Sequence, residues 1–108
     1  IVMKLLLDEC VPRKLRNHLP GIECRTVPEA GFAGRKNGEL LALDEAAGFH
    51  VFLTIDRGIK YEQNLRHQTI GVLVIHTKSS RLDDLLPHVP EILDALGSFL
   101  CGQLIKIG

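Results

Sequence analysis

Three short apolar runs, separated by longer polar or helix-like stretches, constrain the fold of this 108-residue chain more than any other feature. They cover residues 2–7, 51–55 and 70–75, and each is mostly apolar without polar alternation. Runs of this kind are typical of strands in a parallel sheet that is covered on both faces. A less buried strand is predicted over 23–27, where polar and apolar residues alternate, and a closing edge strand over 103–107. The sequence therefore predicts a mostly parallel sheet of four to five strands.

Helical segments are predicted between these strands. The predicted segments are 11–19, a single turn at 28–32, then 37–47, 57–68 and 82–100. Pro12 favours the start of the first helix, where a missing N–H costs little, and Pro20 ends it. Pro87 and Pro90 are expected to split the last segment into two short helices. Strands that alternate with helices imply right-handed crossovers, so we expect one α/β domain over residues 1–108, with helices flanking a central sheet.

The apolar residues of the helical segments predict which faces are buried. In the last segment the residues at helical spacing are Leu82, Leu85, Leu86, Val89, Leu93, Leu96 and Leu100. Between them, Asp83, Asp84, Glu91 and Asp94 are expected to form a solvated face. In the segment at 37–47, we expect Leu40, Leu41, Leu43 and Ala47 to point toward the core and Gly48 to cap the helix.

Composition excludes several classes of protein. Lys plus Arg and Asp plus Glu each number 13, so the chain lacks the basic excess of proteins that coat nucleic acid. An odd count of three cysteines without paired spacing argues against a disulfide framework or a zinc ribbon, and favours a reducing cytoplasm. No apolar run approaches the ~20 residues that span a bilayer, and the apolar start is too short for a signal peptide. We therefore expect a cytoplasmic protein without a membrane partner.

Two of the predicted strands are followed by an aspartate, Asp8 after the first and Asp56 after the strand at 51–55. Ligands of open parallel sheets bind outside the carboxyl ends of the strands, so neighbouring strands would bring both carboxylates to one edge. Two carboxylates about 4 Å apart repel by roughly 4 kcal/mol at an effective dielectric of 20, which a cation relieves. Oxygen ligands suit Mg²⁺ or Mn²⁺. One aspartate after a strand is usually a turn or cap residue, but two at matching strand ends indicate a metal site.

Basic and polar residues follow the acidic strand ends. Arg13, Arg57 and Lys60 are candidates for binding phosphates beside the metal, with ordinary surface charge as the alternative. Tyr61 and Asn64, on the same segment as Lys60, are candidates for contacting a base or ribose. We therefore expect substrate to bind along the segment that follows each acidic strand end.

Two further acids and one cysteine lie near the expected site. Glu39 starts a predicted helix, where the helix dipole favours a carboxylate, so by itself it is expected to be a capping acid. Glu9 is expected to support Asp8 or to pair with a basic side chain. The acids next to Cys10 are expected to raise the pKa of its thiol and blunt its reactivity. The five histidines show no ligand spacing.

Several spaced motifs resemble a family of small PIN-like proteins, and together they run over nearly the whole chain. They are Leu5-Leu6-Leu7-Asp8-Glu9-Cys10-Val11-Pro12, Thr26-Val27, Gly31-Phe32-Ala33-Gly34, Asn37-Gly38-Glu39-Leu40-Leu41, Thr54-Ile55-Asp56-Arg57, Tyr61-Glu62-Gln63-Asn64-Leu65 and Gly102-Gln103-Leu104-Ile105-Lys106-Ile107. The resemblance implies a PIN-like nuclease fold. It also implies the toxin of a toxin–antitoxin pair, whose partner is a small DNA-binding antitoxin, and a homodimer.

The resemblance also implies a mechanism. PIN nucleases place one acid after the first strand, one on a middle helix and one after a later strand, which correspond here to Asp8, Glu39 and Asp56. These acids hold Mg²⁺ or Mn²⁺, which activates a water that hydrolyses RNA phosphodiester bonds and leaves 5′-phosphate ends. Many members carry a fourth acid shortly after the third. This chain has Arg57 at that place, and Glu9 or Glu62 is a candidate substitute for the missing acid.

Two alternatives to a ribonuclease stay open on the sequence alone. The missing fourth acid, and Cys10 where members of this family usually have Asn, favour a catalytically weak PIN-like module that binds a partner. A phospho-acceptor receiver domain also places acids after its first and third strands. It requires a lysine after its last strand, however, whereas Lys106 falls inside the final predicted strand.

Overall fold

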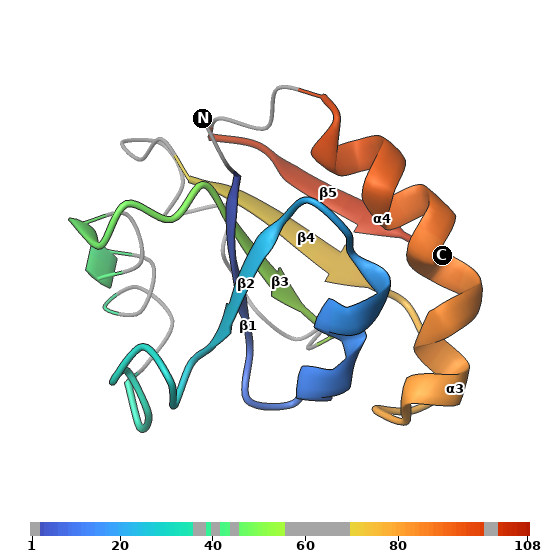
Figure 1. Ribbon diagram of the computed structural model, residues 1–108, viewed down its shortest axis with the longest axis horizontal. Helices are drawn as coiled ribbons and strands as arrows, with labels where there is room; N and C mark the ends of the chain where they lie inside the picture. Colours follow the sequence, from blue (N-terminus) through green and yellow to red (C-terminus); the bar gives the residue numbers. More distant parts are fainter. Residues whose placement is uncertain (1–2, 36–38, 40–41, 44–45, 56–69, 99–101) are drawn as a thin grey trace.

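The computed structural model describes residues 3–35, 39, 42–43, 46–55, 70–98 and 102–108. Its centre is one five-stranded sheet, in which β1 is Lys4–Leu7, β2 Glu23–Thr26, β3 Val51–Thr54, β4 Gly71–Ile75 and β5 Leu104–Ile107. The strand order is β2-β1-β3-β4-β5, and every neighbouring pair is parallel (Figure 1). The α/β class and the central parallel sheet are therefore confirmed, and the sheet is parallel throughout.

Burial along the strands follows the hydrophobic pattern. Every residue of β3 and β4 is buried, because these strands are central and both of their faces are covered. The outer strands β2 and β5 are partly exposed. The alternation of polar and apolar residues predicts this for β2, and the position at the edge of the sheet predicts it for β5. Each strand is shorter than predicted by one or more residues among the described positions, since Met3, Val27, Ile55, Ile70 and Gln103 lie outside the ladders.

The helices of the described chain are short. A 3₁₀ helix, η1, covers Arg13–His18 in place of the α-helix expected over 11–19, because Pro12 and Pro20 bracket a segment too short to propagate i→i−4 bonds. Near the C-terminus, α3 (Leu82–Leu85), η2 (Leu86–His88) and α4 (Val89–Leu96) follow one another. The expected split is confirmed, with Pro87 inside η2 and Pro90 in the first turn of α4, where proline is tolerated.

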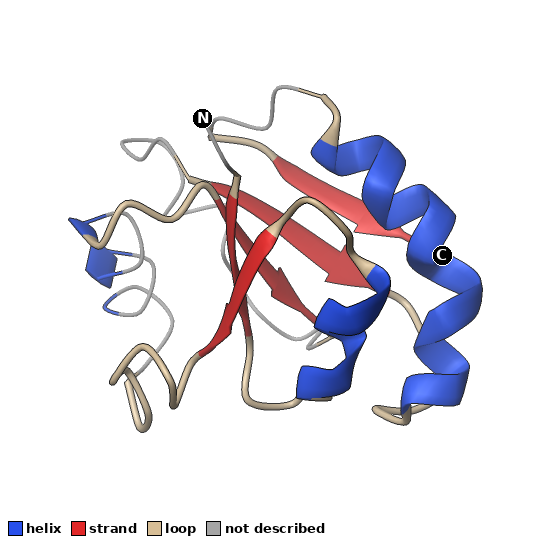
Figure 2. Cartoon of the chain, viewed as in Figure 1, coloured by secondary structure: helices blue, strands red, loops and turns tan. Residues whose placement is uncertain are grey.

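Two apolar cores lie on the two faces of the sheet. On one face, Leu15 of η1 and Leu85 and Ile92 of α3 and α4 pack in one cluster with Leu53 and Leu73 of the sheet. Figure 2 shows these helices on the same side of the strands. On the other face the buried cluster consists of Leu6, Val27, Phe49, Phe52, Ile70, Val72 and Val74, with Ala30 and Phe32 packed against it. Odd and even strand positions thus point to different cores, as the period of two requires.

Three expectations about helix faces need correction. Ile92, absent from the predicted apolar stripe, is fully buried, because it lies three residues after Val89 and four before Leu96 and so shares their face of α4. Asp84 is half-buried rather than solvated, since its Oδ2 accepts a 2.5 Å hydrogen bond from Ser79 Oγ. Ala47 is exposed, because the helix has already ended in a turn at this residue. Leu40, Leu41, Leu100 and the segment 57–68 lie outside the described residues.

The strand order places a topological switch point between β1 and β3. The chain moves outward from β1 to β2 on one side and to β3, β4 and β5 on the other. Crevices at such points, outside the carboxyl ends of the strands, are where open α/β sheets bind ligands. The first residue after β1 is Asp8, so the fold brings this aspartate to the position where a ligand is expected. Among the described residues, no helix has the length and apolar character needed to cross a membrane.

Candidate functional site

Asp8 is held at the switch point by backbone bonds to the neighbouring strands. Its N–H donates to the Leu53 carbonyl of β3 at 3.0 Å, and the carbonyl of Leu7 accepts the Val27 N–H at 2.9 Å. The Asp8 carbonyl then accepts the Val11 N–H at 3.0 Å and closes the turn into η1. The aspartate therefore sits on the rigid part of the fold, and its half-buried side chain emerges from the edge of the sheet.

The Asp8 carboxylate accepts three hydrogen bonds from other residues that the structure describes. Oδ1 accepts the Glu9 backbone N–H at 2.8 Å. Oδ2 accepts the Thr54 hydroxyl at 2.7 Å and the Cys10 thiol at 3.5 Å. Each carboxylate oxygen offers two acceptor positions, so the described residues fill both positions of Oδ2 and one of the two on Oδ1. This carboxylate is therefore oriented by its neighbours.

Thr54 contacts the candidate site through Asp8, and the sequence analysis assigned it no role. It ends β3, is fully buried, and its hydroxyl reaches across to the end of β1. A hydroxyl inside the apolar run Val51–Thr54 was the available signal, because a buried polar group needs a partner. The strand order supplies that partner by placing β1 beside β3.

Cys10 has a raised thiol pKa, as the sequence predicted, although the main cause is a different one. Partial burial of the sulfur raises the pKa most, and the charge of Asp8 and its hydrogen bond add to the effect. Hydrogen bonds from the Ile55 backbone and with Thr54 act in the opposite direction. Since the thiolate is the nucleophile, this cysteine is poorly suited to nucleophilic catalysis.

A pocket of about 330 Å³ opens beside Asp8, between the ends of β1 and β2 and the start of η1. It is lined by Asp8, Glu9, Val11, Arg13, Thr26, Pro28 and Glu29. Arg13, predicted to bind phosphate, therefore shares a pocket with the two acids that follow β1. The guanidinium of Arg13 makes no ion pair within the described residues, so it remains available to an anion.

Glu29 forms a wall of this pocket. Its Oε1 accepts the Thr26 N–H at 2.9 Å, and both its oxygens accept Arg16 Nη1, at 3.0 and 3.1 Å. The Thr26 bond and then the Arg16 guanidinium hold the pKa of Glu29 below its usual value, with Arg16 also acting through its charge. Because Arg16 offsets its charge, Glu29 is a structural acid that ties η1 to the end of β2.

The remaining predicted acids of the described chain have other partners. Glu9 is exposed, and its Oε1 accepts the Gly34 N–H at 3.4 Å. Glu39 lies in helical conformation and is exposed, and its Oε1 accepts Arg35 Nη1 at 2.6 Å. Gly34 and Arg35 are consecutive, so one loop contacts both acids. Among the described residues Glu9 pairs with a backbone amide and with no basic side chain.

Five predicted site residues lie outside the described residues. They are Asp56, Arg57, Lys60, Tyr61 and Asn64. Ile55, which precedes Asp56, is described and follows the last residue of β3. Because β1 and β3 are neighbours, Ile55 follows the same strand pair that carries Asp8. The predicted closeness of Asp8 and Asp56 stays a prediction.

The donor set is compatible with a hard cation such as Mg²⁺ or Mn²⁺. Such ions are commonly held by one or two carboxylates, with water and substrate phosphates completing the shell. In the described part of the chain, no three His, Cys, Asp or Glu side chains gather closely enough to hold a metal. Asp8, Glu9 and Glu39 therefore do not form such a group by themselves. A carboxylate pair of Asp8 with Asp56 would fit, since the described residues occupy only one of the two acceptor positions on Oδ1 of Asp8.

Comparison of the chain with protein-family models, with curated proteins and with solved structures found no match. The family resemblance therefore rests on the motifs in the chain.

Proposed function

We propose that this protein is a Mg²⁺- or Mn²⁺-dependent ribonuclease that hydrolyses RNA phosphodiester bonds. The observation that carries the proposal is the place of Asp8 at the switch point of the parallel sheet, oriented by Thr54 and Glu9 and adjoining a pocket that contains Arg13. An oriented carboxylate, a guanidinium that no described residue pairs with and an open pocket form a set suited to binding a phosphodiester beside a cation.

Each described residue has a separate role in this proposal. Asp8 would hold the cation, while Thr54 fixes the rotation of the carboxylate through Oδ2. Arg13 binds a phosphate oxygen at the mouth of the pocket. A cation held there would supply an activated water and neutralise charge on the phosphate. Asp56 and Glu39 are proposed as the further acids, with Arg57, Lys60, Tyr61 and Asn64 along the path of the RNA.

The family resemblance supports the biological setting of the proposal. A PIN-like ribonuclease of this size acts as the toxin of a toxin–antitoxin pair, binds a small DNA-binding antitoxin, forms a homodimer and works in the cytoplasm. These features belong to the proposal as what the resemblance implies.

A PIN-like module that binds a partner without cutting RNA is the second candidate. One observation favours it, namely that Arg35 engages the Glu39 carboxylate at 2.6 Å, which competes with metal binding at this acid. A receiver domain is less well supported. Its flavodoxin-like strand order matches this sheet, but Lys106 lies inside β5 and not after it.

Incubation with RNA tests the proposal. Purified protein is mixed with a heterogeneous RNA pool in Mn²⁺ or in chelator, beside an Asp56→Asn variant. We expect fragments with 5′-phosphate ends only in the wild-type reaction with Mn²⁺. Asp56→Asn should retain the fold, because replacing one of two adjacent carboxylates removes their repulsion. Absence of cleavage by a wild-type protein that binds Mn²⁺ would favour the partner-binding module, and cleavage at the wild-type rate by Asp56→Asn would remove this residue from the site.

A further inference from the structure

A second pocket opens at the carboxyl edge of the sheet, two strands away from Asp8. It has a volume of about 500 Å³ and lies between the loop that follows β4 and the helical segment formed by α3 and η2. Its lining residues are His76, Thr77, Lys78, Asp84, Pro87 and His88. None of them lines the pocket beside Asp8, so this is a separate site.

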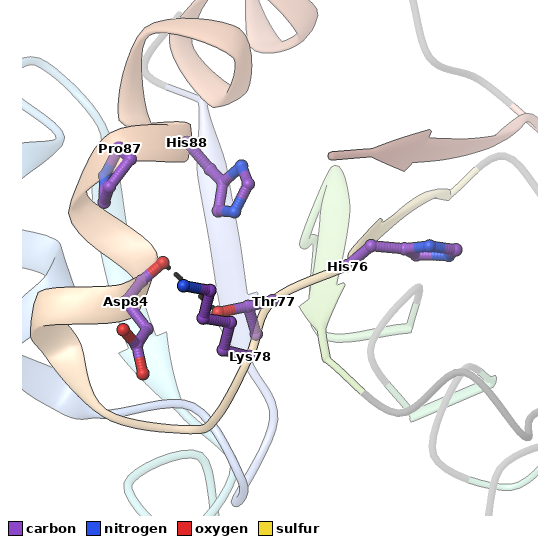
Figure 3. Close-up of a pocket in the computed structure, with 6 residues that line it drawn as sticks. All are labelled: His76, Thr77, Lys78, Asp84, Pro87 and His88. Carbon is purple, nitrogen blue, oxygen red and sulfur yellow. Dashed lines mark hydrogen bonds between the residues drawn. The ribbon is translucent and has the colours of Figure 1, made fainter.

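The alternation of side chains along β4 decides whether the His76 side chain faces this pocket. Leu73 and Ile75 of β4 point to the face that α3 and α4 cover, and Val72 and Val74 point to the other face. Continuing the alternation sends the ring of His76 to the face opposite α3. Figure 3 shows this ring turned away from the other lining residues. His76 therefore contributes its backbone to the pocket wall.

Lys78 supplies a positively charged group to the pocket, and His88 supplies a hydrogen-bond donor. In Figure 3 the Lys78 side chain extends from the loop toward the helical segment, and the His88 ring points from that segment toward the loop. Neither side chain makes a hydrogen bond or an ion pair with any other residue of the described chain. The ammonium of Lys78 offers three donors, and the imidazole of His88 has at least one N–H in either protonation state.

The acid and the hydroxyl in the pocket are already engaged. Asp84 Oδ2 accepts the Ser79 hydroxyl at 2.5 Å, and no nitrogen of Lys78 or His88 lies within 4.0 Å of the carboxylate. The Thr77 hydroxyl is directed at the carbonyls of Ser79 and Asp84, at 3.1 and 3.2 Å. The loop is thus tied to α3 by its own polar groups. What remains for a ligand is an unpaired cation and an imidazole donor.

An anion fits this arrangement better than a metal ion. In the part of the chain that the structure describes, no cluster of three metal-ligating side chains exists, and here the ammonium would repel a cation. A phosphate group offers several acceptor oxygens to converging donors, and lysine is a common partner for it. We propose that this pocket binds a phosphate group through Lys78 and His88. The group comes either from a polynucleotide that crosses the carboxyl edge of the sheet or from a small phosphorylated molecule.

Titration of the full chain followed by amide NMR tests this inference without any catalytic step. The probes are inorganic phosphate and, separately, a short RNA oligonucleotide, both in chelator so that metal binding and cleavage do not enter. We expect saturable shifts at Thr77, Lys78 and His88 with at least one probe. Lys78→Gln should weaken that binding about tenfold, the size of one charge-assisted hydrogen bond. A second variant, His88→Gln, should weaken it in the same direction.

Lys106→Gln is the matched control. Lys106 is an exposed lysine on β5, and its strand position pairs with Val74, which points to the opposite face of the sheet. Lys106→Gln changes the net charge by the same amount as Lys78→Gln, and it should leave the affinity for the phosphate or RNA probe within about twofold of the wild-type value. Tighter, Lys78-dependent binding of the oligonucleotide would identify a polynucleotide phosphate, and a response to inorganic phosphate alone would identify a small ligand. Equal affinity of Lys78→Gln and Lys106→Gln, or no saturable shift with either probe, would overturn the inference.

Discussion

Replacing Asp8 with Asn is expected to lower metal-dependent RNA cleavage on the order of a hundredfold to a thousandfold, as loss of one preorganised electrostatic group does in other enzymes. The amide keeps the shape of the side chain and one oxygen for the Thr54 hydroxyl. It loses the negative charge that attracts the cation. The measurement is the initial rate of RNA cleavage in saturating Mn²⁺, compared with the rate in chelator.

Asp94→Asn is the control for this prediction. Asp94 is an exposed acid of α4, a helix that covers one face of the sheet, so the variant makes the same chemical change away from the strand ends. Its cleavage rate should equal that of the wild type. The unfolding midpoint in urea should show that Asp8→Asn remains folded, at a cost of about 1–3 kcal/mol for the hydrogen bonds to the charged oxygens. A folded Asp8→Asn variant that cleaves at the wild-type rate would contradict the assigned role.

Leu73→Ala is expected to destabilise the fold by about 2–5 kcal/mol, the usual range for truncating a fully buried leucine. Leu73 lies in the middle of β4, between Leu53 of β3 and Ile105 of β5, and none of its surface is exposed. Its side chain belongs to the core beneath α3 and α4, so truncation leaves a cavity where two layers meet. Urea unfolding at 25 °C, followed by circular dichroism, measures the change.

Glu91→Ala serves as the comparison, because Glu91 is exposed on the first turn of α4. It should change the free energy of unfolding by less than about 0.5 kcal/mol, as surface substitutions usually do. A loss below about 1 kcal/mol for Leu73→Ala would mean that this face of the sheet is less tightly packed than the structure shows.

The sheet was predictable from the sequence because its strands are buried on both faces. The runs that form β1, β3 and β4 are continuous and apolar. In a chain where such runs alternate with helical segments, they indicate buried strands of a parallel sheet. The closing strand was predicted at an edge and lies there. The carboxyl-edge position of Asp8 followed from the same pattern, because parallel strands place all their carboxyl ends together.

The helix geometry was less predictable, because short helices depend on packing more than on propensity. The 3₁₀ form of η1 and the 3₁₀ turn of η2 arise where prolines act over a few residues. Ile92, by contrast, lies at α-helical spacing from Val89 and Leu96, so the sequence carried the signal for its burial.

Contacts between side chains from distant segments of the chain could not be predicted from the spacing of residues in the sequence. Thr54 and Asp8 are 46 positions apart, and they meet only because β1 pairs with β3. The same holds for Arg16 and Glu29, which join η1 to the turn after β2. The histidines showed no ligand spacing, yet His88 and Lys78 line one pocket because α3 and η2 fold back beside the loop after β4. Pairings of this kind are set by the tertiary fold.

Binding of Mn²⁺ followed by amide NMR tests the central claim most directly, because the ion broadens the signals of nearby amides whether or not RNA is cut. We predict selective broadening at Glu9, Cys10 and Ile55, which lie at the carboxyl ends of β1 and β3, while the signal of Ser98 beyond the end of α4 persists. Asp8→Asn should abolish the selective broadening, and Asp94→Asn should not. Broadening centred elsewhere, or unchanged in Asp8→Asn, would contradict a metal site at this edge of the sheet.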